Sequence, residues 1–280
     1  MTMLVTGATG RIGRRVIDRL LQEGSAVRAL TRDAQRAADL PAGVEVVAGD
    51  LERPETLAAA FEGVTGAHLI TIGGGDYRPL STGAEIVELA ERAGVRRVTV
   101  LWRGERGSVE EAVTSSGLEW TLLEATEFMS NALQWAPSIA AEGVVREPYA
   151  TSRAAVVDPD DVADMAAEIL LRGGHGGATL VPSGPESLTV PQRVEALARA
   201  LGREIAYVEL SDAEARERWR REGQTDEHIA LIAAWLGDPP AAATTVTGDV
   251  ERVLGRPART FADWAQAHAA EFRAPVSAAG

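Results

Sequence analysis

The sequence predicts an α/β fold, in which a doubly wound parallel sheet carries helices on both faces and is joined to a small C-terminal α/β domain. Two patterns predict this class. The chain opens on a short apolar run, Met3–Thr6, that leads directly into glycines at Gly7, Gly10 and Gly13. Beyond this turn, short β-type runs alternate with helical stretches, which is typical of βαβ units and therefore of a parallel sheet.

Each element is predicted by its own local pattern. Short apolar runs rich in β-branched residues predict strands at Met3–Thr6, Ala26–Leu30, Val44–Ala48, Ala67–Ile72, Arg97–Leu101 and Trp120–Leu123. Apolar residues at helical spacing predict helices at Arg11–Gln22, Asp33–Leu40, Glu55–Phe61, Leu80–Ala93 and Val109–Ser115. Proline in a first turn and capping-box spacing predict further helix starts at Asp158-Pro159, Thr189-x-x-Gln192 and Ser211-x-x-Glu214.

The order of these elements divides the chain into two domains. We expect residues 1–125, with about 151–172 returning to them, to form the sheet domain. We expect residues 126–150 and 173–280 to form a smaller substrate or lid domain.

The glycine turn is the most informative motif. A strand, a Gly-x-x-Gly-x-x-Gly turn and a helix together form a phosphate cradle, because glycine lets the backbone bend tightly and approach a ligand closely. A pyrophosphate then lies on the unpaired N–H groups at the helix start. A Rossmann-like dinucleotide site is therefore expected. The residues expected to bind the dinucleotide here are Gly7, Thr9, Gly10, Arg11, Ile12 and Gly13.

The loop after the second strand reads Thr31-Arg32-Asp33, about 19 positions beyond the last glycine of the motif, where the ribose 2′ position is usually recognised. Two guanidinium groups, those of Arg32 and Arg11, suit a 2′-phosphate, so NADP(H) is favoured over NAD(H). The alternatives are a salt bridge from Arg32 to Asp33 and a solvated side chain at Arg11.

Two further loops lie at the carboxyl ends of expected strands, where such sheets bind ligands. Asp50, followed by Leu51, is placed to accept from an adenine amino group; alternatively it caps the next helix. Thr71, Ile72 and Gly73 begin a glycine-rich loop suited to close approach by ribose or nicotinamide, or form a plain loop.

Composition excludes several kinds of site. The chain has no cysteine, which excludes thiolate chemistry. Its formal net charge of -13 argues against nucleic acid as a partner. Its histidines, at His68, His175, His228 and His268, lack metal-ligand spacing, so no metal is expected. No apolar run is long enough to span a membrane and no signal peptide is recognised, so we expect a cytoplasmic protein. Whether it is a monomer or a homodimer is left open by the sequence.

Several spaced motifs together resemble the NmrA-like branch of atypical short-chain dehydrogenases/reductases. They are Thr6-Gly7-Ala8-Thr9-Gly10-x-x-Gly13, Arg32, Gly49-Asp50-Leu51, Ser116-Gly117-Leu118-Glu119-Trp120-Thr121, Phe128-Met129-x-Asn131 and the closing stretch from Gly248 to Phe261. The resemblance covers nearly the whole chain. It implies an NAD(P)-binding domain with a small C-terminal domain over a substrate cleft, in a family of quinone, dye and carbonyl reductases and non-catalytic dinucleotide sensors.

The chain departs from the related catalytic pattern. The main branch of short-chain dehydrogenases uses a serine with Tyr-x-x-x-Lys, but this chain has no lysine at all. Its only tyrosines are Tyr77, Tyr149 and Tyr207, and the expected helix Val109–Ser115 contains none of them. The usual proton-donating groups are therefore missing.

A reductase without these groups needs another source for the proton. The donor is another side chain, with Tyr149 and Glu124 as candidates, or water, or the substrate itself. Trp102 and Phe128, near the ends of the last two expected strands, are candidates for flat walls around an aromatic ring, or pack in the core. The sequence thus predicts an NADPH-dependent reductase of a hydrophobic aromatic ketone, quinone or enone. The alternative is a non-catalytic NADP-sensing regulator.

Overall fold

The computed structural model describes residues 1–73, 78–102 and 106–273, which divide into two compact units. Unit 1 comprises Met1–Ala125, Pro159–Pro182 and Gly248–Pro257. Unit 2 comprises Thr126–Asp158, Ser183–Thr247 and the chain from Ala258 onward.

Unit 2 begins after Ala125, and three segments lie in the other unit from the one expected. Residues 151–158 belong to unit 2, where β8 (Arg153–Ala154) pairs with β10 (Leu188–Thr189). Residues 173–182 belong to unit 1, because β9 (Ala178–Leu180) extends its sheet beside β6 (Glu119–Glu124). Residues 248–257 also belong to unit 1.

Unit 1 is built around a parallel sheet with the strand order β3-β2-β1-β4-β5-β6-β9. Besides β6 and β9, its strands are β1 (Thr2–Val5), β2 (Ala26–Thr31), β3 (Glu45–Ala48), β4 (Val64–Ile70) and β5 (Arg97–Trp102). Each of the strands expected in the first 125 residues is present. The short strand β9, which follows the glycine-rich segment 173–177, was not predicted. The strand order reverses between β1 and β4, and ligands bind at such a switch point in open parallel sheets.

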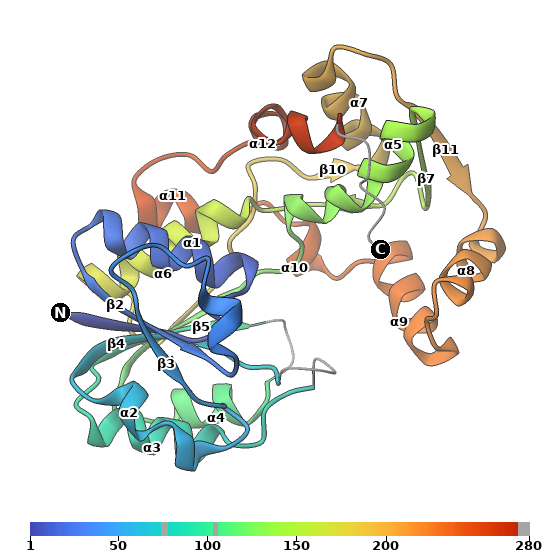
Figure 1. Ribbon diagram of the computed structural model, residues 1–280. Coiled ribbons are helices and arrows are strands. Elements are labelled where there is room, and N and C mark those ends of the chain that lie inside the picture. Colours follow the sequence, from blue (N-terminus) through green and yellow to red (C-terminus); the bar gives the residue numbers. More distant parts are fainter. Residues whose placement is uncertain (74–77, 103–105, 274–280) are drawn as a thin grey trace. The chain divides into compact units, whose positions relative to one another are not determined.

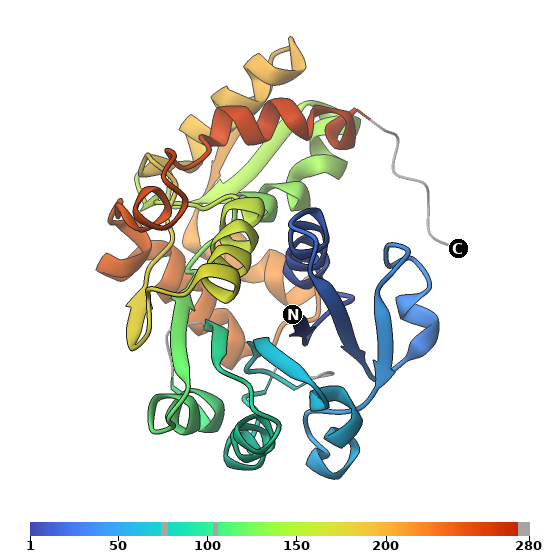
Figure 2. The same cartoon turned by 90° about the vertical axis from the view of Figure 1, so that its left-hand side faces the viewer.

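Helices cover both faces of this sheet (Figures 1 and 2). On one face lie α1 (Arg11–Gln22) and α6 (Pro159–Arg172), which pack against each other, with α11 (Asp249–Leu254) beside α6. On the other face lie α2 (Ala58–Phe61), α3 (Gly83–Arg92) and α4 (Ser108–Thr114). The interior between α2–α4 and the sheet is apolar, with Leu57, Phe61, Leu69 and Ile86 almost fully buried.

Two expected helices are shorter than predicted. The stretch Asp33–Leu40 forms only the 3-10 turn η1 (Ala34–Ala37), since it has few apolar residues to pack and Pro41 follows it. The stretch Glu55–Phe61 is divided between the 3-10 turn η2 (Pro54–Thr56) and α2.

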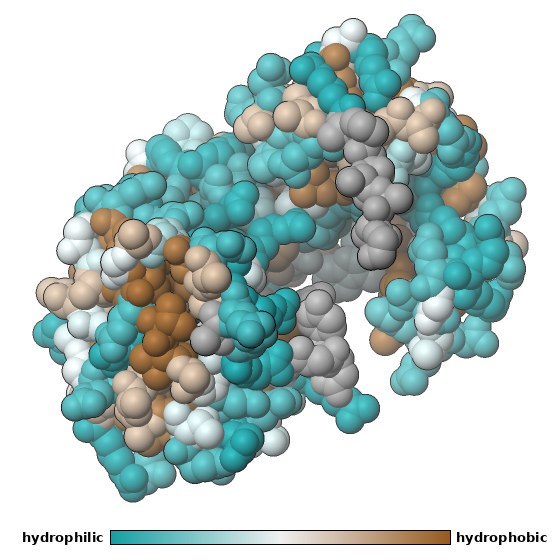
Figure 3. Space-filling model, in the orientation of Figure 1, coloured by the Kyte–Doolittle hydropathy of each residue, from teal (hydrophilic) through white to brown (hydrophobic). Residues whose placement is uncertain are grey.

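One edge of the sheet is open to solvent. The strand β3 is largely exposed, and Val46 on it is 40% exposed. Apolar residues reach the surface where Figure 1 draws β2 and β3 (Figure 3). Arg32 and Asp33, which follow β2, are also exposed.

Unit 2 contains two small sheets, β7 (Val144–Pro148) with β11 (Ala206–Leu210) and β8 with β10. Its helices and 3-10 turns are η3 (Met129–Trp135), α5 (Ala136–Glu142), α7 (Val190–Leu201), α8 (Asp212–Arg221), α9 (Asp226–Gly237), α10 (Ala241–Thr244), α12 (Phe261–Ala267) and η4 (Ala269–Phe272). The expected capping boxes at Thr189 and Ser211 open α7 and α8. Phe261, Trp264 and Phe272 form the centre of its core. Within the described ranges, no helix has the length and apolarity that a bilayer span requires.

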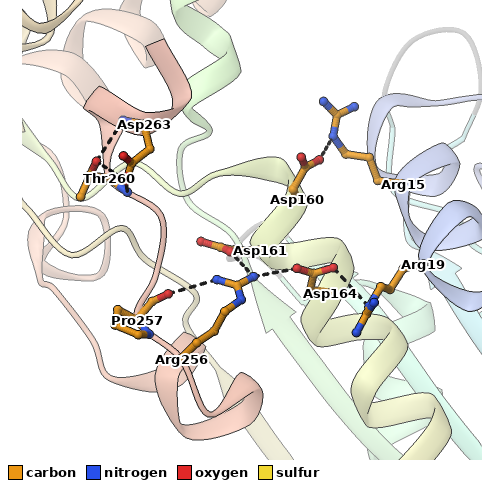
Figure 4. A network of polar contacts seen from close by, with 9 residues as sticks. All are labelled: Arg15, Arg19, Asp160, Asp161, Asp164, Arg256, Pro257, Thr260 and Asp263. Carbon is orange, nitrogen blue, oxygen red and sulfur yellow. Dashed lines mark hydrogen bonds and ion pairs between the residues drawn. The ribbon is translucent and has the colours of Figure 1, made fainter. Parts of the chain in front are cut away.

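A set of ion pairs joins α1, α6 and the segment that follows α11 in unit 1 (Figure 4). Arg15 and Arg19 of α1 contact Asp160 and Asp164 of α6. Arg256, just after α11, donates from Nη2 to Asp161 at 2.8 Å and to Asp164 at 2.7 Å. The Asp161 side chain is fully buried, so the Arg256 cation compensates a charge that has no access to water.

We expect the variant Arg256→Met to lose about 3 kcal/mol of unfolding free energy, because it leaves the buried Asp161 carboxylate without this cation. Urea denaturation followed by circular dichroism measures the loss. The double variant Arg256→Met, Asp161→Asn should regain a large part of it. If the double variant were no more stable than the single one, the ion pair would not be the cause.

Candidate functional site

The turn after β1 is anchored to β4 through Thr6. Its N–H donates to the carbonyl of His68 at 2.9 Å, and its Oγ1 accepts from the N–H of Ile70 at 2.8 Å. Gly7 follows in the left-handed region, with φ +60, and a Cβ there would lie 2.8 Å from Cγ2 of Ile70. Only glycine fits this position without displacing the end of β4.

Helix α1 starts directly against this turn. The N–H of Gly10 donates to the carbonyl of Gly7 at 2.9 Å, and a Cβ on Gly13 would lie 2.2 Å from the same carbonyl oxygen. Gly10 is the N-cap of α1, no side chain of the described residues caps it, and its first turn holds no acidic residue. The first N–H groups of α1 therefore form a site for an anion.

A cavity of about 360 Å³ lies along the carboxyl ends of β1, β2, β3 and β4. The residues expected to bind a dinucleotide that line it are Gly7, Thr9, Arg32, Asp50, Leu51, Ile72 and Gly73. Gly10, Arg11, Ile12, Gly13 and Thr71 are outside its lining; Gly10 and Gly13 instead shape the glycine turn.

The segment after β2 brings a second arginine to the cavity. Thr31 Oγ1 donates to the carbonyl of Asp33 at 2.9 Å, and Asp33 Oδ1 accepts from the N–H of Gln35 at 2.8 Å, which caps η1. This short turn carries Arg36 back to the cavity that Arg32 lines. Arg36 was not among the residues expected from the sequence; its spacing of four residues from Arg32 is the signal that would have indicated it.

Arg14 of α1 joins this segment to the glycine turn. Its Nε donates to the carbonyl of Thr9 at 3.1 Å, and its Nη1 and Nη2 donate to the carbonyls of Asp39 and Arg36, each at 3.3 Å. The guanidinium therefore fixes the backbone that presents Arg36. This role depends on backbone carbonyls, so no sequence motif shows it.

The loop after β3 is held by its own hydrogen bonds. The N–H of Asp50 donates to Thr56 Oγ1 at 2.9 Å, and Asp50 Oδ1 accepts from the N–H of Glu52 at 3.0 Å. The Asp50 side chain thus closes a turn to Glu52 and does not cap the next helix. The carbonyl of Leu51 accepts from Thr82 Oγ1 at 2.5 Å, which fixes this loop to α3.

The loop after β4 returns on itself. The N–H of Gly73 donates to the carbonyl of Arg78 at 2.7 Å, and the N–H of Leu80 donates to the carbonyl of Thr71 at 2.9 Å. Thr71, Ile72 and Gly73 are therefore paired with the segment 78–80. The remainder of the glycine-rich stretch and Tyr77 lie outside the described residues.

Three expected site residues, Trp102, Glu124 and Phe128, lie at or after the ends of β5 and β6. Trp102 ends β5, but its side chain lies outside the described part of the structure. Glu124 ends β6, is half-buried, and has its pKa raised above the usual value by burial. Phe128 belongs to unit 2, where it is half-buried at the N-cap of η3 and pairs with Val157.

Tyr149, the other candidate acid, lies in unit 2. Among the described residues it is the one non-glycine residue with a positive φ, of 56°. Its hydroxyl donates to Asp212 Oδ1 at 2.5 Å. Burial and the Asp212 carboxylate raise the pKa of Tyr149. Tyr149, Trp135 and Trp235 line a second, small cavity of about 70 Å³ in unit 2. A hydroxyl already bound to a carboxylate is a weaker proton donor than a free phenol.

The structure shows no arrangement of metal ligands: no group of three His, Asp or Glu residues suited to a cation occurs among the described residues. His68 is fully buried on β4, and burial lowers its pKa to about 4. Its Nδ1 lies 2.9 Å from Thr99 Oγ1. It is therefore a neutral residue of the sheet interior.

Comparison with known proteins places this geometry in context. A family model for NAD(P)H-binding matches residues 7–104. The NADPH-dependent quinone oxidoreductase QOR2 of Escherichia coli, solved with NADPH, aligns with a TM-score of 0.81 at 24% identity, over 95% of this chain and 99% of that chain. The negative transcriptional regulator NmrA, solved with NADP, aligns with a TM-score of 0.73 at 20% identity, over 95% and 94%. These likenesses show the fold.

Two curated relatives match along their whole length. A (4-alkanoyl-5-oxo-2,5-dihydrofuran-3-yl)methyl phosphate reductase of Streptomyces griseus is 36% identical over 285 residues, which cover 96% of this chain and 99% of that protein. An NAD(P)H azoreductase of Xenophilus azovorans is 33% identical over 290 residues, which cover 97% and 99%. The chain belongs to the NmrA-like family of atypical short-chain dehydrogenases/reductases.

Membership in the NmrA-like family confirms three predictions from the sequence: the family, the Rossmann-like fold and the class of enzyme, an NAD(P)H-dependent oxidoreductase. The glycine turn fits such a cofactor. The absence of a side chain at Gly13 lets the Gly7 carbonyl lie against α1, and this close packing brings the turn to the N–H groups at the helix start.

We expect the variant Gly13→Ala of this NmrA-like chain to bind NADP⁺ at least about tenfold more weakly, because the new Cβ displaces the Gly7 carbonyl and with it the anion site. Isothermal titration calorimetry measures the affinity. Gly117→Ala is the matched control, since its Cβ would lie 3.8 Å from Glu91 Oε1 and meet nothing closer. Unchanged affinity in Gly13→Ala would contradict the role of the turn.

Proposed function

We propose that the chain is an NADPH-dependent reductase of a hydrophobic aromatic small molecule with a ketone, quinone or enone group, working without a Ser-Tyr-Lys set. The observation that carries the proposal is the cavity at the switch point of the sheet, with two arginines at its β2 end. Arg32 and Arg36 line the same cavity as the glycine turn, so a nucleotide on that turn would meet two guanidinium groups beyond β2.

The cofactor roles follow from the loops. Gly7, Thr9 and the start of α1 hold the diphosphate, whose charge the helix dipole stabilises. Arg32 and Arg36 hold the 2′-phosphate, with Arg11 of the first helical turn as a further cation. The remaining expected contacts are Asp50 and Leu51 at the adenine, and Thr71, Ile72 and Gly73 at the ribose and nicotinamide.

Two observations support the proposed substrate class: the absence of lysine from the sequence and the names of two relatives. With no lysine in the sequence, no tyrosine can be kept acidic in the usual way, so acceptors whose reduced form is delocalised are favoured. The Streptomyces griseus relative is named for a conjugated furanone, and the Xenophilus azovorans relative for azo compounds. From the sequence, Trp102 and Phe128 each remain a candidate for an aromatic contact with such rings.

NADPH, when bound, supplies the hydride. The chain's own residues hold the dinucleotide at the carboxyl edge of the sheet and keep its 2′-phosphate on the arginine pair. They must also hold the acceptor and provide or admit a proton.

We expect Arg32→Glu to weaken NADPH binding about a hundredfold and NADH binding little, since only NADPH carries the 2′-phosphate that the guanidinium pairs with. Arg36→Glu should act in the same direction. Calorimetric titration with both nucleotides measures the change, and Arg221→Glu, an exposed charge reversal on α8 in unit 2, is the matched control. Equal losses for the two nucleotides would remove the 2′-phosphate role.

The activity itself is tested by following NADPH oxidation with quinones, polycyclic ketones and triarylmethane dyes. We expect turnover with at least one of these acceptors. Complete inactivity together with tight NADP⁺ binding would instead support a non-catalytic sensor of the NADP redox state.

A further inference from the structure

The last strand before unit 2 ends on a carboxyl group, that of Glu124. In the sheet register, Ile70 of β4 pairs with Leu101 of β5, and Leu101 pairs with Leu123 of β6. Glu124, which pairs with Trp102, therefore lies one row beyond Ile70, and Ile70 lines the dinucleotide cavity. Two strand spacings separate Glu124 from β4, about 10 Å along the carboxyl edge. This is the edge along which ligands of such sheets lie.

The Glu124 carboxyl differs from the other glutamate of its strand. No hydrogen bond or ion pair joins it to any described residue, and its pKa is raised by burial alone. At Glu119, burial acts in the same direction, but the N–H of Gly174 and the Arg97 guanidinium hold its pKa below the usual value. Glu119 is thus a stabilised carboxylate, whereas Glu124 more readily keeps its proton.

The other described candidates for an acid are committed elsewhere. The hydroxyl of Tyr149 donates to Asp212. The hydroxyl of Tyr207 donates to the carbonyl of Glu147 at 2.8 Å, and burial with nearby carboxylates raises the pKa of Tyr207 to about 12. The sequence contains no lysine or cysteine that would serve instead.

We propose that Glu124 is the proton donor to carbonyl acceptors, an inference that rests on the proposed reductase function. The hydride adds to the carbonyl carbon, the C=O π electrons move to oxygen, and that oxygen takes the proton of the Glu124 carboxyl. Water then returns a proton to the carboxylate. In the overall reaction, NADPH, one proton and a ketone are converted to NADP⁺ and an alcohol.

The proton requirement divides the acceptors into two groups. A ketone needs both hydride and proton. A cationic triarylmethane dye needs only hydride, because hydride addition to its central carbon gives a neutral product directly. A variant that lacks the proton donor but keeps the cofactor site should therefore lose one activity and keep the other.

The experiment compares the parent with Glu124→Gln, which keeps shape and removes the proton. We expect kcat with a polycyclic ketone to fall at least about a hundredfold. We expect kcat with a triarylmethane dye and KM for NADPH to stay within about twofold. Glu124→Asp should regain part of the ketone activity. Glu111→Gln, an exposed isosteric change on α4, is the matched control.

A second measurement needs no cofactor. Carbon-13 NMR of the ligand-free protein should show a glutamate carboxyl resonance that titrates above the ordinary glutamate range and is missing in Glu124→Gln. Thermal unfolding of both proteins confirms that the variant folds. Absence of this resonance in the parent would overturn the proposal.

The kinetic outcomes separate the two hypotheses. A parent that reduces neither acceptor defeats the reductase function itself, and the proton-donor role with it. A parent that reduces only dyes, or a Glu124→Gln variant that loses both activities equally or neither, overturns the role of Glu124 alone. If the parent reduces only ketones, a fall in kcat of about a hundredfold in Glu124→Gln with unchanged KM for NADPH supports the role, and an unchanged kcat overturns it.

Discussion

The close approach of α1 to the turn after β1 is the constraint on which the dinucleotide site depends. The Gly7 carbonyl occupies the space that a side chain at position 13 would need, and Gly7 itself lies against Ile70 at the end of β4. Thr6 joins the same two strands through its backbone and its hydroxyl. Strand, turn and helix therefore fix one another, and the N–H groups at the helix start point in one direction.

Much of unit 1 could be predicted from the sequence because its signals are local. Apolar runs gave the strands from β1 to β6, and the bounds of α1 agree with the expected Arg11–Gln22. The errors occur where distant residues decide. The strand β9 forms only because β6 offers an edge, and residues 248–257 join unit 1 through Arg256, which pairs with Asp161 at a sequence separation of 95 residues. No local pattern contains that information.

The candidate site was predictable to a similar extent. The glycine motif and the loops after β2, β3 and β4 led to Arg32, Asp50 and Ile72, which line one cavity. Arg36 was missed because it reaches this cavity through a 3-10 turn where a longer helix was expected. That Glu124 has no polar partner among the described residues is likewise a property of the folded neighbourhood, since a carboxyl next to an arginine in space can be far from it in sequence.

The division of unit 1 into three segments has a consequence for how the protein is made. When the ribosome has released the first 182 residues, all strands of the large sheet exist, but Asp161 still lacks the cation that Arg256 provides. A nascent chain at that stage lacks the Arg256 cation beside the buried Asp161 carboxylate, so its unit 1 is less stable than that of the complete chain. The nucleotide-binding unit therefore gains this ion pair only after most of unit 2 has emerged from the ribosome.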